Sequence, residues 1–133
     1  MKNWFTISMF FLLSTGLYGQ QWVDDNTIDS AIASQSGFDD SNEIVVIEFY
    51  ADFNKDNSFK DRNKLTDVTY YLCDIAKSPK SKKQYRIRMA PTIIIFMQGV
   101  QSLKYKAGLD LKCPVTLEEI KKDIAEVKKE SQY

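Results

Sequence analysis

Long apolar runs alternate with polar stretches along this chain, and they predict a mixture of strands and helices. Residues 44–51 form a nearly continuous run of β-branched and aromatic side chains, which is typical of a strand buried on both faces. Residues 92–97 and 100–106 form two further runs around Gln98-Gly99 and predict a hairpin. Residues 68–75 also favour a strand, because Thr-Tyr-Tyr has high β propensity.

Helical spacing of apolar residues occurs near both ends of the chain. Residues 26–36 place Ile28, Ala31 and Ile32 on one face, and Gly37 is a stop signal. Near the C-terminus, Thr116-Leu-Glu-Glu119 is a capping box, and Val115 precedes it in position to contact Ile120. The apolar stripe of this last helix consists of Leu117, Ile120, Ile124 and Val127.

The remaining segments are shorter. We expect a short edge strand over residues 20–24, a polar loop over 38–42, and a loop with about one helical turn over 79–85. No repeat, low-complexity tract or second domain is evident, so residues 20–133 are interpreted as one domain.

The first 19 residues have the pattern of a secretory signal peptide. Lys2 supplies a positive start, residues 4–13 are apolar, and Gly16 and Gly19 lie where small residues favour cleavage. The apolar run is short for a membrane span, so an uncleaved anchor is the less favoured alternative. We therefore expect an exported protein, periplasmic or secreted, with no stable membrane insertion after cleavage.

Charge and composition exclude several classes of function. The chain has 18 basic and 18 acidic residues, a balance that argues against a nucleic-acid-binding protein. It contains no histidine, which excludes Ser-His-Asp and Cys-His catalysis and removes the commonest transition-metal ligand. We expect no metal and no cofactor. One locally basic segment, residues 77–88, contains six cationic side chains and no acid.

Two segments together resemble a thioredoxin. The first is the strand at 44–51 with Phe49-Tyr-Ala-Asp-Phe53 at its end, and the second is Tyr85-Arg-Ile followed by Pro91-Thr92. The resemblance covers roughly residues 22–128. It implies an α/β thioredoxin-like fold, with a central mixed sheet of four to five strands flanked by helices. It also implies a cis peptide bond between Ala90 and Pro91.

The Cys-x-x-Cys positions of that family read Asn54-Lys-Asp-Asn57 in this chain. An amide has no ionisable nucleophile, so dithiol exchange is excluded at Asn54 and Asn57. The four residues favour a turn into a helix, with Asp56, Asn57 or Ser58 as caps. This helix is expected to be shortened, because the strand at 68–75 follows soon after it. A helix that continues through Tyr71 is the alternative.

Three other residues are candidates for chemistry. Glu48 matches the family's buried acid, and Leu72 occupies the place of its lysine partner, so we expect a hydroxyl, water or another lysine to satisfy Glu48. Cys73 and Cys113 are the only thiols. Either they form a structural disulfide, or Cys73 is buried and Cys113 lies apart from it.

The resemblance implies a peptide-binding groove at Phe53, Ala90, Pro91, Ala107 and Gly108. The favoured interpretation is a redox-inactive binding or accessory module that holds an extended peptide or protein partner there. One alternative is an atypical thiol-disulfide oxidoreductase or isomerase that uses Cys73 or Cys113. Another is a structural subunit whose partner surface is the basic segment 77–88.

Overall fold

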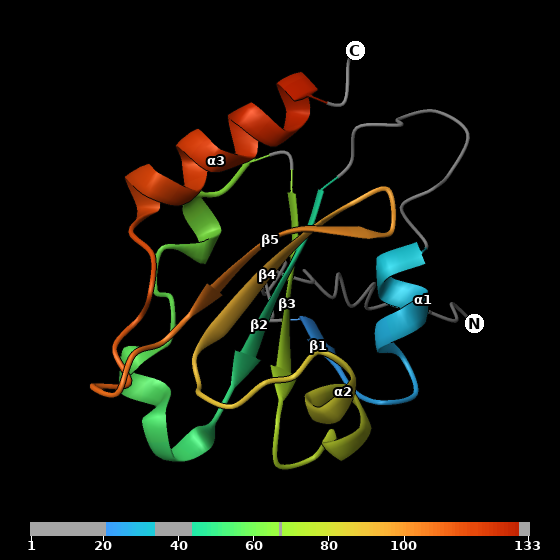
Figure 1. Ribbon diagram of the computed structural model, residues 1–133, viewed down its shortest axis with the longest axis vertical. Coiled ribbons are helices and arrows are strands. Elements are labelled where there is room, and N and C mark those ends of the chain that lie inside the picture. The colour runs from blue at the N-terminus through green and yellow to red at the C-terminus, as the bar shows by residue number, and fades with distance from the viewer. Residues whose placement is uncertain (1–20, 34–43, 67, 131–133) are drawn as a thin grey trace, which may run out of the picture.

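The computed structural model describes residues 21–33, 44–66 and 68–130 (Figure 1). The predicted signal peptide at 1–19 and the predicted loop at 38–42 lie outside the described residues, so both stay predictions. No helix among the described residues is long and apolar enough to cross a membrane.

The centre of the protein is a five-stranded mixed sheet with the order β1-β3-β2-β4-β5. β1, β3 and β2 are parallel to one another, whereas β4 and β5 are antiparallel to their neighbours. This is the mixed sheet that the resemblance implies. The strands are β1 (Gln21–Val23), β2 (Ile44–Tyr50), β3 (Val68–Asp74), β4 (Thr92–Met97) and β5 (Val100–Lys106).

Helices cover both faces of this sheet. In Figure 1, α3 (Leu117–Glu130) and the 3-10 helices η1 (Asp52–Asn57) and η2 (Arg62–Lys64) lie to the left of the sheet. α1 (Ile28–Ala33) and α2 (Pro79–Gln84) lie to its right.

The central strand β2 divides the hydrophobic core in two, because successive side chains of a strand point to opposite faces. Val45, Ile47 and Phe49 pack with α1, whereas Ile44 and Val46 pack with α3. The first six residues of β2 are buried, as the apolar run at 44–51 predicted. The predicted α/β architecture, a mixed sheet of five strands with helices on both faces, is therefore confirmed.

Two strongly patterned segments have the predicted structure. β4 and β5 form the hairpin around Gln98-Gly99, and Gly99 has a φ of 79°, which glycine adopts without strain. The apolar stripe of α3 faces the core, and the Thr116 hydroxyl accepts a hydrogen bond from the Glu119 amide at 3.2 Å. The bond between Ala90 and Pro91 is cis, as predicted.

The segment after the Asn54 turn differs from the prediction of one short capped helix. It forms two 3-10 helices, and neither has a side-chain capping hydrogen bond, so the proposed caps at Asp56, Asn57 and Ser58 are wrong. Its polar groups instead bond to distant partners, described below. The alternative helix through Tyr71 is also wrong, because this residue lies in β3.

The prediction of a loop at 79–85 understated α2, which runs from Pro79 to Gln84. The Asp25 carboxylate accepts hydrogen bonds from the Lys80 and Ser81 amides at 3.1 and 2.7 Å. It thereby satisfies amides that a helix start leaves unpaired. Within the first predicted helix, the described α1 spans Ile28–Ala33, and Gly37 lies outside the described residues.

Candidate functional site

The turn after β2 is held by the side chain of Asn54. Its Nδ2 donates to the carbonyl oxygens of Ala90 and Leu111, each at 2.8 Å. Its Oδ1 accepts from Nδ2 of Asn57 at 2.7 Å. The two amides that stand where the resemblance places cysteines therefore have structural partners, and neither can act as a nucleophile.

These contacts also explain why the turn does not continue as an α-helix. Asn54 has φ −118° and ψ 23°, which are not helical values. Ser58 follows in an extended conformation, with φ −60° and ψ 151°. Contacts to residues 36 and 57 positions away in sequence thus decide the local backbone.

The residues predicted to form a groove do meet at this end of the sheet. Ala90 contacts Asn54 through the hydrogen bond described above, and the Ala107 amide donates to the Pro91 carbonyl at 3.2 Å. Ala90, Pro91 and Ala107 are buried, whereas Gly108 and Phe53 are exposed. The Ala90 carbonyl already accepts from Asn54, so a peptide that pairs with this oxygen either shares it with Asn54 or displaces the Asn54 side chain.

A basic pocket of about 380 Å³ lies beside Pro91. Its walls include Met89 and Thr92, which flank the Ala90–Pro91 bond. Its other lining residues are Arg86, Arg88, Lys106 and Ala107. No Asp or Glu of the described ranges lines it. Burial, and after it the nearby cations Lys106 and Arg86, lower the pKa of Lys104.

Glu48 lies at the centre of a buried polar network under the turn. The side chain is fully buried in β2 and accepts hydrogen bonds from the Ser58 hydroxyl, the Phe59 amide at 3.1 Å and the Tyr70 hydroxyl at 2.6 Å. Two hydroxyls and one backbone amide therefore satisfy this carboxyl. Burial and the nearby Glu48 raise the pKa of Tyr70 well above its usual range.

Arg62 supplies a cation to this network, which the sequence analysis missed. Its guanidinium donates to the Ser58 hydroxyl at 3.2 Å and lies 5.9 Å from the centre of the Tyr70 ring. At position 72, where the resemblance places a lysine, Leu72 is apolar and buried. Arg62 of η2 instead contacts Ser58 and Tyr70, two of the residues that donate to Glu48, and no pattern in the sequence indicates this link.

The two cysteines are free thiols that pack on different faces of the sheet. Cys73 is fully buried beside α1, and Cys113 is half-buried against the core under α3. The arrangement with two separate thiols is the one observed. Burial is the main cause that raises the pKa of each thiol, so neither is activated as a thiolate.

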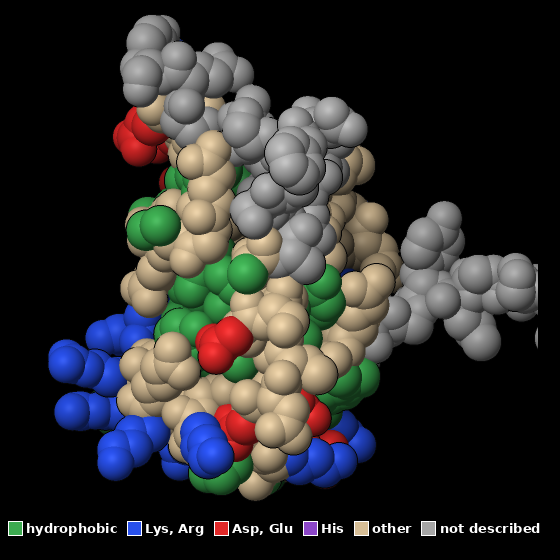
Figure 2. Space-filling view, turned by 90° about the vertical axis from the view of Figure 1, so that its right-hand side faces the viewer, with side chains coloured by type: hydrophobic (Ala, Val, Ile, Leu, Met, Phe, Trp, Pro, Cys, Tyr) green, Lys and Arg blue, Asp and Glu red, His purple; other side chains and the backbone are tan. Residues whose placement is uncertain are grey.

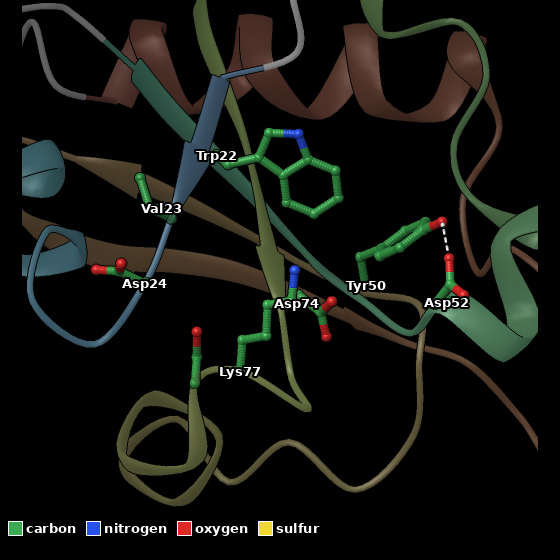
Figure 3. A pocket seen from close by; sticks show the side chains of 8 residues that line it. Trp22, Val23, Asp24, Tyr50, Asp52, Asp74 and Lys77 are labelled. Carbon is green, nitrogen blue, oxygen red and sulfur yellow. Dashed lines mark hydrogen bonds between the residues drawn. The ribbon is translucent and has the colours of Figure 1, made fainter.

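A second cavity, lined by aromatic and acidic side chains, lies at the carboxyl ends of the parallel strands (Figure 3). No pattern in the sequence indicates this cavity, because the proximity of its residues depends on the pairing of β1, β3 and β2. Within the described residues, no group of three His, Cys, Asp or Glu side chains could hold a metal ion.

Comparisons with known proteins detect similarity in structure alone. No model of a known protein family matches the sequence, and no curated protein sequence matches it. A mutant thioredoxin from Halobacterium salinarum aligns with a TM-score of 0.62 and 18% identity, over 80% of this chain and 88% of that one. Thioredoxin from Malassezia sympodialis aligns with a TM-score of 0.59 and 15% identity, over 82% and 90%.

A thioredoxin from Schistosoma mansoni aligns similarly, with a TM-score of 0.58 and 18% identity, over 80% of this chain and 94% of that one. At such identities the likeness establishes the fold, and function depends on the residues at the site. The sheet order, the cis bond before Pro91 and these alignments lead to one conclusion: the chain has a thioredoxin-like fold in which no Cys-x-x-Cys pair is present.

Proposed function

We propose that this protein is a redox-inactive binding module that holds an extended segment of a partner protein beside Pro91. The observation that carries the proposal is the pair of hydrogen bonds from Asn54 to Ala90 and Leu111. Through these bonds, the side chain at the position where the resemblance places a nucleophile has a structural role. The cis bond between Ala90 and Pro91 is kept beside it. We further propose that the protein acts after export, on the basis of the signal-peptide pattern at 1–19.

Exposed apolar side chains support binding at this end of the molecule. Phe53 is 80% exposed and Leu109 is 91% exposed. Phe53 directly precedes Asn54, and Leu109 lies two residues before Leu111, to which Asn54 is bonded. Large apolar side chains in such positions contribute much of the free energy of protein association when a partner covers them.

The basic pocket supports a partner segment that carries acidic residues. Arg86, Arg88 and Lys106 line it, and within the described ranges the one ion pair closer than 4 Å joins Lys64 to Asp61. These three cations therefore have no acidic partner there. A segment with an apolar residue against Phe53 and an acidic residue in the basic pocket fits both features.

The test is capture of partners by crosslinking to the full chain in its native compartment. Phe53→Ser and Leu109→Ser should each reduce capture, and Arg88→Glu should reduce it further at low salt. Val100→Ser is the matched control, since Val100 is 67% exposed on the hairpin, away from Pro91. An unchanged set of partners in the Phe53 and Leu109 variants would contradict the proposal.

Asn54→Ala distinguishes two modes of binding. The substitution frees the Ala90 carbonyl. Capture should increase if the partner adds a strand there, and it should stay unchanged if side chains alone make the contact.

The alternative of a thiol-disulfide oxidoreductase rests on Cys73 and Cys113. Full burial of Cys73, the raised pKa of both thiols and their separation across the sheet disfavour it. An insulin-reduction assay with dithiothreitol should show no catalysis. Catalysis that disappears in the Cys73→Ala/Cys113→Ala double variant would support the alternative instead.

The alternative of a structural subunit rests on the segment 77–88. Figure 2 shows Lys and Arg side chains gathered around the lower end of the face that carries α2. Lys82 and Lys83 of α2 are exposed there. Charge reversal at these two lysines should leave capture unchanged if binding occurs beside Pro91, and should abolish it if α2 is the partner surface.

A further inference from the structure

A cavity of about 690 Å³ opens where the parallel strands β1, β3 and β2 end. It contains none of the residues assigned above to the surface beside Pro91, so an inference from it is independent of the proposed function. Eight side chains from three stretches of the chain, 22–24, 50–52 and 74–78, line it (Figure 3). They are Trp22, Val23, Asp24, Tyr50, Asp52, Asp74, Lys77 and Ser78.

Two aromatic rings form one wall of this cavity. Trp22 and Tyr50 contact each other edge to face, with centroids 5.4 Å apart and planes at 83°. Trp22 is 51% exposed although it is a large apolar side chain on an edge strand. An indole in this setting offers a surface on which a cation can stack.

The charged lining is predominantly negative. The lining contains three carboxylates and one ammonium group, which gives an excess of two negative charges. The carboxylates belong to Asp24, Asp52 and Asp74, and the ammonium belongs to Lys77. Among the described residues, none of the three carboxylates forms an ion pair within 4 Å. After burial, Asp52 and Asp74 are the main groups that raise the pKa of Tyr50, which indicates a negative potential along this wall.

Hydrogen bonds use only part of these carboxylates. Oδ1 of Asp24 accepts from the Asn26 and Thr27 amides, Oδ1 of Asp74 accepts from the Ala76 amide at 2.9 Å, and Oδ1 of Asp52 accepts from Tyr50 at 3.4 Å. Within the described part of the chain, the Oδ2 atoms of these residues accept no side-chain or amide hydrogen bond.

Ser78 adds an uncharged oxygen that also lacks a donor. The residue is fully buried, lines the cavity, and has no hydrogen-bond partner for its hydroxyl within the described structure. Burial raises the pKa of the nearby Cys73 thiol, an effect that the Ser78 hydroxyl opposes, and this thiol offers Ser78 only a weak donor. Because Asp25 caps α2, Ser78 is not needed as a capping residue. A buried hydroxyl without a partner is unusual in a folded protein.

We propose that this cavity binds a guanidinium group, stacked on Trp22 and hydrogen-bonded to Asp52, Asp74 and Ser78. A guanidinium has five donors and no acceptor, so it suits a cavity in which carboxylate oxygens and the Ser78 hydroxyl lack donors. A bare metal ion fits less well, because no three carboxylates of the described residues converge closely enough to hold one. An anion would meet an excess of negative charge.

The test uses Trp22 as a fluorescent reporter in the full chain. The sequence has two tryptophans, and Trp4→Phe removes the other one. N-acetyl-arginine amide should change the emission of Trp22 saturably, whereas N-acetyl-citrulline amide, its neutral isostere, should not. Asp74→Asn and Asp52→Asn should each weaken binding about tenfold or more, since each removes a charged acceptor.

Three controls make the outcome decisive. Asp56→Asn removes an exposed carboxylate that does not line the cavity and should leave affinity unchanged. Lys77→Gln should tighten binding, and Ser78→Ala should weaken it less than Asp74→Asn does. Circular dichroism confirms that each variant is folded.

Saturable binding of the arginine amide with this pattern of variants supports the proposal. It is overturned by the absence of saturable change, by an equal response to the citrulline amide, or by unaltered affinity in both Asp52→Asn and Asp74→Asn. Agmatine and a capped Gly-Arg-Gly peptide then distinguish the source. Tighter binding of agmatine indicates a small guanidine compound, and tighter binding of the peptide indicates an arginine of a protein segment.

Discussion

Removal of the buried carboxyl of Glu48 should strongly destabilise the fold. Glu48 is fully buried in the central strand and accepts hydrogen bonds from Ser58, Phe59 and Tyr70. Glu48→Ala takes away all three acceptor contacts at once. The Tyr70 side chain is partly exposed and can turn to water, whereas the Ser58 hydroxyl and the Phe59 amide are buried.

The expected loss follows from those two buried donors. An unsatisfied buried donor costs about 1–3 kcal/mol, so two of them cost about 2–6 kcal/mol, and we expect a loss of about 4 kcal/mol in the free energy of unfolding. The total free energy of unfolding of a domain of this size is about 5–15 kcal/mol. Glu48→Gln keeps one carbonyl oxygen that can accept from the Phe59 amide, so its loss should be smaller, about 1–2 kcal/mol.

Urea denaturation followed by far-ultraviolet circular dichroism measures these differences by linear extrapolation. Glu126→Ala is the matched control, because Glu126 is exposed on α3, and its effect should stay within about 0.5 kcal/mol. A Glu48→Ala variant within about 1 kcal/mol of the wild type would refute the reasoning, because two buried donors cannot then have lost their acceptor. So would a Gln variant as unstable as the Ala variant.

Three further predictions concern the thiols, alkaline pH and the last helix. Cys113 should react with a thiol reagent faster than fully buried Cys73, and both should react more slowly than free cysteine. After denaturation without reductant, followed by alkylation, mass spectrometry should find both cysteines alkylated. An intact internal disulfide would contradict the structure. Because the pKa of Tyr70 is raised in the folded protein, the unfolded chain loses the phenolic proton of Tyr70 at a lower pH than the folded protein does. The free energy of unfolding should therefore fall as the pH rises above about 10, and it should fall less steeply in Tyr70→Phe than in the wild type. An equal slope in both proteins would argue against the shift. Thr116→Ala should cost about 1 kcal/mol in a thermal or urea melt, whereas Thr116→Ser should cost little.

Some features could be predicted because they depend on neighbouring residues. The residues at 44–51 are apolar at nearly every position, so a strand formed by them is stable only where both of its faces are covered. The first six residues of β2 are buried accordingly. The hairpin at Gln98-Gly99 and the start of α3 at Thr116 depend on turn and capping chemistry within a few residues. The absence of a nucleophile at Asn54 and Asn57 also follows from residue type alone.

Other features were decided only by tertiary contacts. The sequence predicted a capped helix after Asn54, but that side chain bonds to Ala90 and Leu111, and the chain forms 3-10 turns. α2 exceeds the predicted single turn because Asp25, more than fifty positions earlier, accepts from its first amides. Arg62 joins the network of Glu48 through Ser58, and this contact likewise depends on how the folded chain brings η2 to β2. Local patterns thus determine which residues enter strands, whereas the partner of each polar group depends on which distant segments the sheet brings together.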